Sequence, residues 1–251
     1  MRVLLLGSGT SVPSALRSPP GFLVEGSDRC QLVDPGPGAC HRLALAGFSP
    51  PAIDDIVISH LHPDHVCDLV PFLFSLRNPR WGKQVSWPRI IAPEGFLDFY
   101  RKLQIPFGGW LPAPGDDIEI VEWRGEGIEA GKFLLTAHLV DHIDSSLAWR
   151  WAEDGGAVLV FSGDTGPCDG IVDAATDADL LLLECSAPLG SAFDGHLCPE
   201  SGSEVIRRSG ARRVVLVHLN PECDQVDIVG QFDEDLIDRI EAGRDLESYE
   251  T

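Results

Sequence analysis

The chain carries at residues 59–65 the stretch Ser-His-Leu-His-Pro-Asp-His, directly after the apolar run Ile56–Ile58. An apolar run of this kind is typical of a buried strand. His60 and His62 share one face by the two-residue period of a strand, and Pro63 ends the strand. Crowding so many titratable side chains costs desolvation energy unless a ligand pairs with them. Because imidazole and carboxylate suit zinc, manganese or iron, the stretch predicts a metal site.

Length and composition are those of an ordinary globular protein. The chain has 251 residues, of which 44% are hydrophobic and 23% charged, so we expect one domain over residues 1–251. The formal net charge of -20 is the main deviation. It disfavours a broad face for polyanions, and a nucleic-acid partner is therefore not expected. A small anionic substrate remains compatible, because bound cations would dominate the local field. A homodimer is also compatible with the sequence.

The seven cysteines form no C-x-x-C pair, and their number is odd. This pattern disfavours a thiolate metal site or a disulfide framework and favours a reducing compartment. The apolar run near the N-terminus is too short for a secretion signal, and no segment reaches the length needed to span a membrane. We therefore expect a cytoplasmic protein with no membrane partner.

Apolar runs and turn signals predict an α/β chain in which both element types recur in each half. We expect helices at 39–46, 64–75, 94–102 and 199–209, and an acidic closing helix at 232–241. Strands are expected at 2–6, 21–25, 31–33, 56–58, 89–91, 180–183 and 214–217, and antiparallel ones at 117–140, 147–151 and 157–161. Two β-sheets packed together with helices outside is the natural layering.

Two loops allow alternative interpretations. Gly7–Pro13 is glycine-rich, but it lacks the Gly-Lys-Ser/Thr ending of a phosphate loop and has Val12 where a dinucleotide fingerprint needs glycine. A tight turn is the better interpretation. The polar loop at 77–89, spiked with Trp81 and Trp87, is either plain surface or a lid over a substrate.

Further metal ligands are expected where other strands end in loops. Asp164 follows the apolar run at 159–161 and Gly163, which permits a close backbone approach. Taken alone, Asp164 fits a turn or a helix cap equally well. His218 ends the apolar run Val214–Val217 and is a candidate ligand.

Four other histidines are less clearly placed. His138 and His142 are four residues apart, so they share a face if one strand carries both, and periodicity does not choose between them. His196 lies just ahead of a helix and suits a mobile proton donor or a plain surface residue. His41 lies within a predicted helix and is expected to be structural.

With these residues in place, the chain resembles the metallo-β-lactamase-fold hydrolases, and within them the ribonuclease Z-like phosphodiesterase branch. The resemblance covers nearly the whole chain. Its landmarks come in the family's order: the Gly7–Pro13 loop, Val33-Asp34-Pro35-Gly36, the histidine block, a later histidine, Ser162-Gly163-Asp164-Thr165 and His218-Leu219. The resemblance implies a four-layer αββα sandwich of two mixed β-sheets with helices outside.

The resemblance also implies a ligand set for two divalent metal ions, zinc first and manganese or iron as alternatives. One metal would be held by His60, His62 and His142, the other by Asp64, His65 and His218, and Asp164 would bridge them. His142 is preferred to His138 because the Ser and the aromatic-Arg strand that follow it match the family. Asp34 corresponds to a carboxylate that orients the ligands, and His196 to a proton-donating histidine.

Such a ligand set implies hydrolysis. Two close cations share a hydroxide and lower the pKa of its parent water toward ~7. Asp64 would accept the water's proton and His196 would protonate the leaving oxygen. We expect a small or cyclic phosphodiester as substrate. The bridging Asp164 disfavours lactam hydrolysis, and His62, where redox members have Glu, disfavours oxidoreductase chemistry.

Three alternatives remain. The first is a lactonase or thioesterase, since nothing in the sequence defines the substrate pocket. The second is transfer-RNA 3′-processing, but the chain lacks the long inserted arm of ribonuclease Z and the Ser and Arg-Tyr usual after His218. The third is a metal-bound regulatory protein without turnover, which the complete ligand set argues against.

Overall fold

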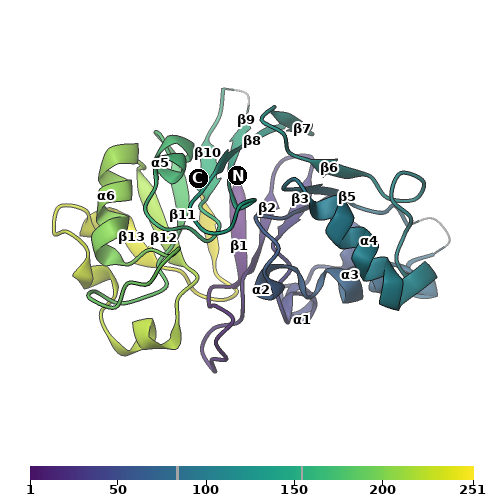
Figure 1. Ribbon diagram of the computed structural model, residues 1–251, viewed down its shortest axis with the longest axis horizontal. Helices are drawn as coiled ribbons and strands as arrows, with labels where there is room; N and C mark the ends of the chain where they lie inside the picture. The colour runs from purple at the N-terminus through teal and green to yellow at the C-terminus, as the bar shows by residue number, and fades with distance from the viewer. Residues whose placement is uncertain (83–84, 154) are drawn as a thin grey trace.

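Two sheets form the centre of the computed structural model, which describes residues 1–82, 85–153 and 155–251 (Figure 1). The first sheet has the order β14-β1-β2-β3-β4-β5-β6, and β3 to β6 run parallel to one another. Its strands are β1 (Arg2–Gly7), β2 (Gly21–Glu25), β3 (Cys30–Val33), β4 (Asp55–Val57), β5 (Arg89–Ala92), β6 (Ile120–Glu122) and β14 (Ser248–Glu250).

The second sheet has the order β13-β12-β11-β10-β9-β8-β7. Strands β7 to β10 pair antiparallel, and β10 to β13 pair parallel. Its strands are β7 (Ile128–Ala130), β8 (Phe133–Leu139), β9 (Leu147–Glu153), β10 (Val158–Phe161), β11 (Leu180–Glu184), β12 (Arg213–Val217) and β13 (Ile240–Ala242). Both sheets are therefore mixed, and each has a parallel half.

Helices cover the outer face of each sheet, as Figure 1 shows on its right and left sides. Beside the first sheet lie α1 (Ala39–Leu45), α2 (Pro63–Val66), α3 (Leu69–Leu76) and α4 (Phe96–Phe107). Beside the second lie α5 (Asp169–Ala174) and α6 (Pro199–Ser209). The predicted four-layer αββα sandwich is confirmed. None of the described helices is long and apolar enough to cross a membrane.

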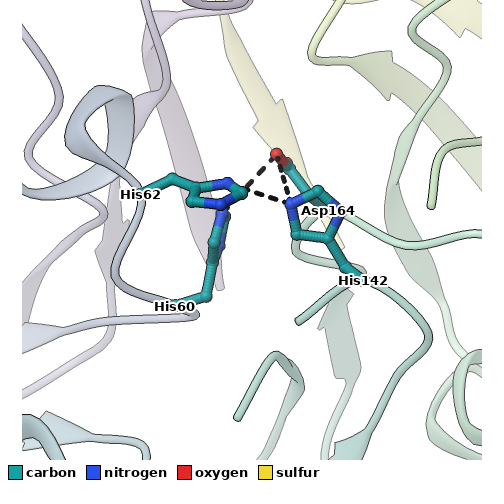
Figure 2. A group of neighbouring side chains, drawn as sticks. All are labelled: His60, His62, His142 and Asp164. Atoms are coloured by element: carbon teal, nitrogen blue, oxygen red, sulfur yellow. Dashed lines mark hydrogen bonds and ion pairs between the residues drawn. The ribbon is translucent and has the colours of Figure 1, made fainter. Parts of the chain in front are cut away.

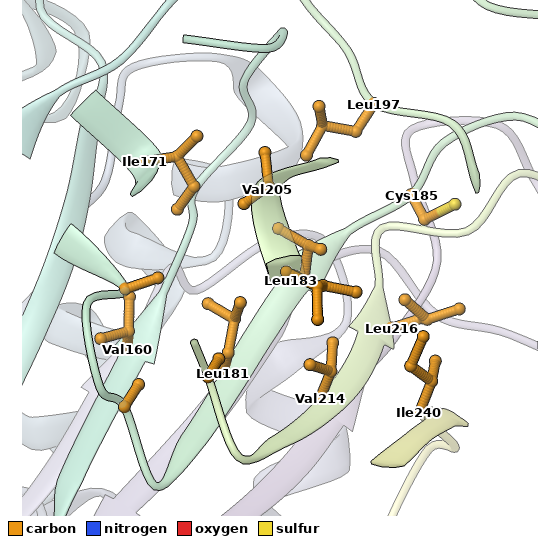
Figure 3. Packing of buried hydrophobic residues seen from close by; sticks show 14 of the residues in the cluster. Val160, Ile171, Leu181, Leu183, Cys185, Leu197, Val205, Val214, Leu216 and Ile240 are labelled. Atoms are coloured by element: carbon orange, nitrogen blue, oxygen red, sulfur yellow. The ribbon is translucent and has the colours of Figure 1, made fainter. Parts of the chain in front are cut away.

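Strand periodicity sorts the apolar side chains into separate cores. On β9, Trp149 and Trp151 point into the core between the sheets, while Ala148 faces the helices outside. The layer between the second sheet and its helices is packed from Val160, Leu181 and similar side chains (Figure 3). Each fully buried side chain of this size contributes about 1.5–3 kcal/mol. These cores fix the strand ends on which the site is built.

The predicted closing helix at 232–241 is wrong. The segment makes turns, a single 3-10 turn at Ile237–Arg239, and then the edge strand β13. Phe232, Leu236 and Ile240 are all buried and lie four residues apart, which imitates a helical period. The pairing of β13 with β12 outweighs the helical preference of the sequence.

Four smaller differences concern element limits and pairing. Strand β6 runs parallel to β5, not antiparallel as expected at 117–140, because α4 makes a crossover between them. The helix expected at 64–75 is divided into α2 and α3 at Cys67–Asp68. The helix expected at 94–102 begins at Phe96 and continues to Phe107. Strand β14, which was not expected, pairs with β1 and brings the two ends of the chain together.

Candidate metal centre

The candidate site lies where parallel strands of both sheets end. Asp34 follows β3, His60 follows β4, Asp164 follows β10 and His218 follows β12. Parallel strands present their carboxyl ends at one edge of a sheet, which is where open α/β sheets bind ligands. The packing of the two sheets brings the two edges together, so segments far apart in sequence converge.

One group of side chains consists of His60, His62, His142 and Asp164, whose ligand atoms all lie within 4.8 Å of one another. Figure 2 shows the three rings and the carboxylate converging on one space. The Nε2 atom of His142 lies 3.0 Å from Nδ1 of His62 and 3.8 Å from Oδ2 of Asp164. Three imidazoles and a carboxylate are a donor set that fits a divalent cation.

A second group of ligand atoms within the same limit consists of Asp64, His65 and His218. The Nε2 atom of His218 lies 3.5 Å from Oδ2 of Asp64. Oδ2 of Asp164 lies 3.2 Å from Nε2 of His218 and 3.3 Å from Nε2 of His65. The same oxygen is 3.7 Å from Nε2 of His60. The Asp164 carboxylate therefore lies between the two groups.

Several atoms that face this space have no hydrogen-bond partner among the described residues: Nε2 of His60, His65 and His218, and Oδ1 of Asp164. All four side chains are buried. A buried polar atom without a partner costs about 1–3 kcal/mol. Their convergence is accounted for if cations bind there, so the residues present fit divalent metal ions.

Asp34 orients the histidine block from beneath. It is fully buried, and its carboxylate accepts hydrogen bonds from the backbone N–H of Ser59 (2.7 Å) and from Nδ1 of His65 (2.8 Å). The second bond leaves Nε2 of His65 facing the metal site. Asp34 and His218 both have positive φ, 44° and 54°. Non-glycine residues rarely adopt this strained conformation, which clusters at functional sites.

Two further contacts orient the later histidines. The residues that make them, Gly195 and Ser186, had no role predicted from the sequence. The carbonyl oxygen of Gly195 accepts a hydrogen bond from Nδ1 of His142 at 3.0 Å. The hydroxyl of Ser186 lies 2.9 Å from Nδ1 of His218. In each case the other nitrogen, Nε2, is left for the metal site. No sequence signal marks a backbone carbonyl as a partner.

Glu184 joins these contacts to His196. Its buried carboxylate accepts hydrogen bonds from Nδ1 of His196 (2.8 Å), the Ser186 hydroxyl (2.9 Å) and the Thr165 N–H (2.9 Å). Sequence reasoning gave this residue no role, although a carboxylate at the end of the apolar run of β11 was a visible signal. A ring nitrogen of His196 also lies within 4.8 Å of ligand atoms of Asp164 and His218.

The surroundings prepare three of the donors for cations. Burial, and after it the neighbouring His65, lowers the pKa of His60 to about 2. Burial also lowers the pKa of His142. Burial alone would raise the pKa of Asp64, but His218 and His65 outweigh it and lower it to about 2. Neutral imidazoles and ionised carboxylates are the forms that bind metal.

Two histidines shift the other way. Burial opposes protonation of His65, but Asp164 and Asp34 raise its pKa well above the ordinary value. Burial likewise opposes protonation of His196, and the hydrogen bond and charge of Glu184 raise the pKa of His196. Loading a cation onto His65 therefore releases a proton. The raised pKa of His196 favours the protonated form, which is the form that a proton donor needs.

A cavity of about 960 Å³ opens from the site to the surface, lined by His62, His142 and His196 among others. An apolar groove of about 700 Å³, lined by Val66, Phe74 and others, contains none of the converging atoms. It lies beside the site, because Leu61 and Pro63 of the histidine block also line it.

The remaining predicted residues lie elsewhere. Strand β8 ends at Leu139, so no single strand carries both histidines: His138 pairs with Ala148 within the sheet, and only His142 reaches the site. His41 is exposed on α1.

The loop at 77–89 does not reach the site in its described part. Trp81 and Trp87 line a cavity together with Asp54 and Arg89. Asp54 precedes β4 and Arg89 begins β5, so this cavity lies at the sheet edge opposite the metal site. Positions 83 and 84 lie outside the described residues.

The chain is similar to known proteins over most of its length. The sequence profile of the Metallo-beta-lactamase superfamily matches residues 18–218. An uncharacterized protein of Mycobacterium leprae is 29% identical, over 92% of this chain and 82% of that protein. A ribonuclease Z of Mycolicibacterium gilvum is 28% identical, over 88% of this chain and 85% of that protein.

Solved structures share the fold. YhfI of Bacillus subtilis, a metallo-beta-lactamase fold protein, superposes with a TM-score of 0.82 at 21% identity, covering 99% of this chain and 98% of that one. The short form of human tRNase Z gives 0.77 at 20% identity, covering 100% and 99%. A diphosphatase of the PhnP family gives 0.74 at 17% identity, covering 99% and 97%.

Proposed function

The chain belongs to the metallo-beta-lactamase superfamily, a family of metal-dependent hydrolases, and from that premise we propose that it hydrolyses a small or cyclic phosphodiester with two bound metal ions. One observation carries the proposal. The buried Asp164 carboxylate lies within 3.2–3.8 Å of imidazole nitrogens from both groups of donors. A shared carboxylate of this kind suits a pair of cations better than a single one.

The residues that would hold the metals are those that converge. We assign His60, His62 and His142 to one ion, Asp64, His65 and His218 to the other, and Asp164 to both. When bound, the ions supply a nucleophilic water at neutral pH and positive charge for the phosphate oxygens. Imidazole and carboxylate donors suit zinc, with manganese and iron as alternatives.

The protein's own groups handle the protons. The ionised carboxylate of Asp64 accepts a hydrogen bond from the attacking water and aligns it. His196, whose pKa is raised by the hydrogen bond and charge of Glu184, gives a proton to the leaving oxygen. Asp34 and Gly195 keep His65 and His142 in the orientation that the site needs.

The substrate proposal rests on size and charge. The net charge of -20 disfavours long polyanions, and core elements fill the second half of the chain, where ribonuclease Z carries its arm. One structural neighbour is called a diphosphatase. Because relatives bear the name ribonuclease Z, precursor transfer RNA belongs among the substrates to be tested.

The decisive experiment is metal analysis followed by parallel assays. Purified protein is given bis(p-nitrophenyl) phosphate, a cyclic nucleotide, a precursor transfer RNA and a lactone. We expect two equivalents of divalent metal and turnover of a small diester that Asp64→Ala abolishes while the protein stays folded by circular dichroism.

The other outcomes separate the alternatives. Turnover of the lactone alone would make the protein a lactonase, and cleavage of precursor transfer RNA alone would make it a processing nuclease. Tight binding of a nucleotide without any turnover would favour a regulatory protein.

The compartment and the domain organisation are also proposals. All seven cysteines are free, which suits a reducing compartment such as the cytoplasm. The two sheets share one buried core that includes Val3 and Tyr249 from opposite ends of the chain. We therefore propose that residues 1–251 fold as one domain.

A further inference from the structure

The opening of the metal site carries an exposed aromatic ring. Phe193, in the segment between β11 and α6, is 46% exposed and lines the same cavity as His62, His142 and His196. The centre of its ring lies 4.6 Å from that of His196. An apolar ring left in water beside a catalytic cavity loses free energy that a bound ligand would recover.

The ring is tied to the site by its own turn. The backbone N–H of His196 donates to the carbonyl of Phe193 at 3.3 Å. Gly195, inside this turn, has a φ of 75° and supplies the carbonyl that orients His142. The turn that carries the ring therefore also holds a metal ligand and the proton donor, which places Phe193 on the side of the leaving group.

The rim of the same cavity is acidic. Asp141, Asp194 and Glu200 line it, all three are exposed, and none forms an ion pair in the part of the chain that the structure describes. No lysine or arginine is among the described residues that line the cavity. At the inner end lie the unpartnered buried atoms of the metal site. The cavity thus has donor atoms for cations at its inner end and negative charge at its opening.

We propose that Phe193 is a stacking platform for a planar group of the substrate, and that the acidic rim rejects substrates with additional phosphates. The site then takes a singly charged phosphodiester with a flat ring system near the phosphorus, such as an aryl or nucleoside diester. This inference rests on the proposed function and names its substrate class.

The physical argument has two parts. Flat rings stack on aromatic side chains with little dependence on their identity, so Phe193 selects planarity. A phosphate at the inner end of the cavity would be attracted by bound cations, whereas a second phosphate at the opening meets three carboxylates and no lysine or arginine among the described lining residues. Selectivity against polyanions is thus repulsion built into the opening.

The platform is tested with three substitutions at Phe193 and bis(p-nitrophenyl) phosphate as probe. We expect Phe193→Ala and Phe193→Leu to lower kcat/KM about fivefold or more. Phe193→Trp should keep it within about twofold, because Trp also stacks. Leu fills similar space but does not stack, so it separates stacking from support of the turn. Metal content and circular dichroism should be unchanged in all three. If Phe193→Leu keeps the kcat/KM of the wild type, or if Phe193→Ala does not lower it, stacking on Phe193 is disproved.

The rim is tested by charge. The probes are thymidine 5′-(p-nitrophenyl phosphate) and the same ester carrying a 3′-phosphate. We expect the wild type to prefer the first, and raising salt to weaken that preference by screening. The triple variant Asp141→Asn, Asp194→Asn, Glu200→Gln should reduce the preference by at least about threefold at low salt.

A matched variant neutralises three exposed carboxylates beside the first sheet: Glu94→Gln, Asp116→Asn and Glu126→Gln. It should leave the preference unchanged. Equal effects of the two triple variants would mean that net charge, not the rim, sets selectivity. If the wild type hydrolyses no diester at all, the proposed function fails and this inference falls with it. Diester turnover that is indifferent to the Phe193 and rim variants disproves this inference alone.

Discussion

His142 and His138 are chemically identical, and their surroundings separate them. His142 lies beyond the end of β8, with Nδ1 bound to the Gly195 carbonyl and Nε2 facing the site. His138 stays within the strand, opposite Ala148. The difference lies in the turn at 141–146, which leaves the sheet and re-enters it at β9.

We predict that His142→Ala removes metal and lowers diester hydrolysis by at least about 100-fold, since even groups behind the ligands affect metal affinity about 10–100-fold. His138→Ala should stay within about twofold of the wild type in both respects. Metal content by elemental analysis and kcat/KM for an aryl diester measure the difference. Loss of metal from His138→Ala with an intact His142→Ala would reverse the assignment.

Glu184 acts through its charge on His196, the proposed proton donor. Burial lowers the pKa of His196, and the carboxylate outweighs burial and raises it. Because the donor acts in its protonated form, activity should fall as the pH rises through this raised pKa. Glu184→Gln removes the negative charge, so we predict that the basic limb of the kcat profile shifts to lower pH.

The measurement is kcat against pH for the wild type, Glu184→Gln and, as control, Glu204→Gln, a carboxylate exposed on α6. The control profile should match the wild type. A basic limb that stays in place in Glu184→Gln would show that His196 is not the donor.

At the scale of elements, the ends of β4 and β9 are joined across the sheets. The indole N–H of Trp149 donates to the carbonyl of Ile58 at 2.9 Å, and the N–H of Leu147 donates to the carbonyl of Ser59 at 3.1 Å. These bonds fix the strand end that delivers His60. Packing between the sheets thus sets the geometry of the site.

We predict that Trp149→Phe destabilises the protein by about 1–3 kcal/mol, because the buried Ile58 carbonyl loses its partner. Trp123→Phe is the matched control, since the buried Trp123 Nε1 has no partner among the described residues and its loss leaves nothing unpaired. Urea unfolding should place Trp149→Phe at least about 1 kcal/mol below Trp123→Phe. Equal stabilities would mean that the bond contributes nothing measurable.

Elements with clear periodicity and end signals were predicted well. The helix at 39–46 and the strands that lead to Asp34, His60 and His218 lie within a residue or two of their expected limits. The helix prediction for the acidic segment at 232–241 was wrong. Its apolar side chains lie four residues apart without forming a helix, and the end of the segment pairs as β13 with the edge of the second sheet. The spacing of apolar residues in a sequence indicates which side chains are buried, but not which element they pack against.

For the whole molecule, we expect metal binding to be a source of stability. Converging buried donors without partners destabilise the metal-free fold, and a ligand that binds only the folded state stabilises it by about 2.7 kcal/mol at 100 times its Kd. We predict that chelation lowers Tm by roughly 5–10 °C and that added zinc restores it.

Asp164→Ala provides the control, because it removes the carboxylate placed between both groups of donors. Its Tm should respond much less to chelator or zinc. A response equal to that of the wild type would mean that metal binds elsewhere.

The sequence by itself determined the class of chemistry and the strands that carry it. Local signals sufficed there, because the histidine block, Asp164 and His218 each follow an apolar run that marks a strand end. The likeness of residues 142–150 to the family had already favoured His142 over His138, where strand periodicity could not choose. Only the tertiary structure placed Glu184, Ser186 and Gly195 behind the site and made β13 a strand. These outcomes depend on contacts between segments distant in the chain, which no local pattern encodes.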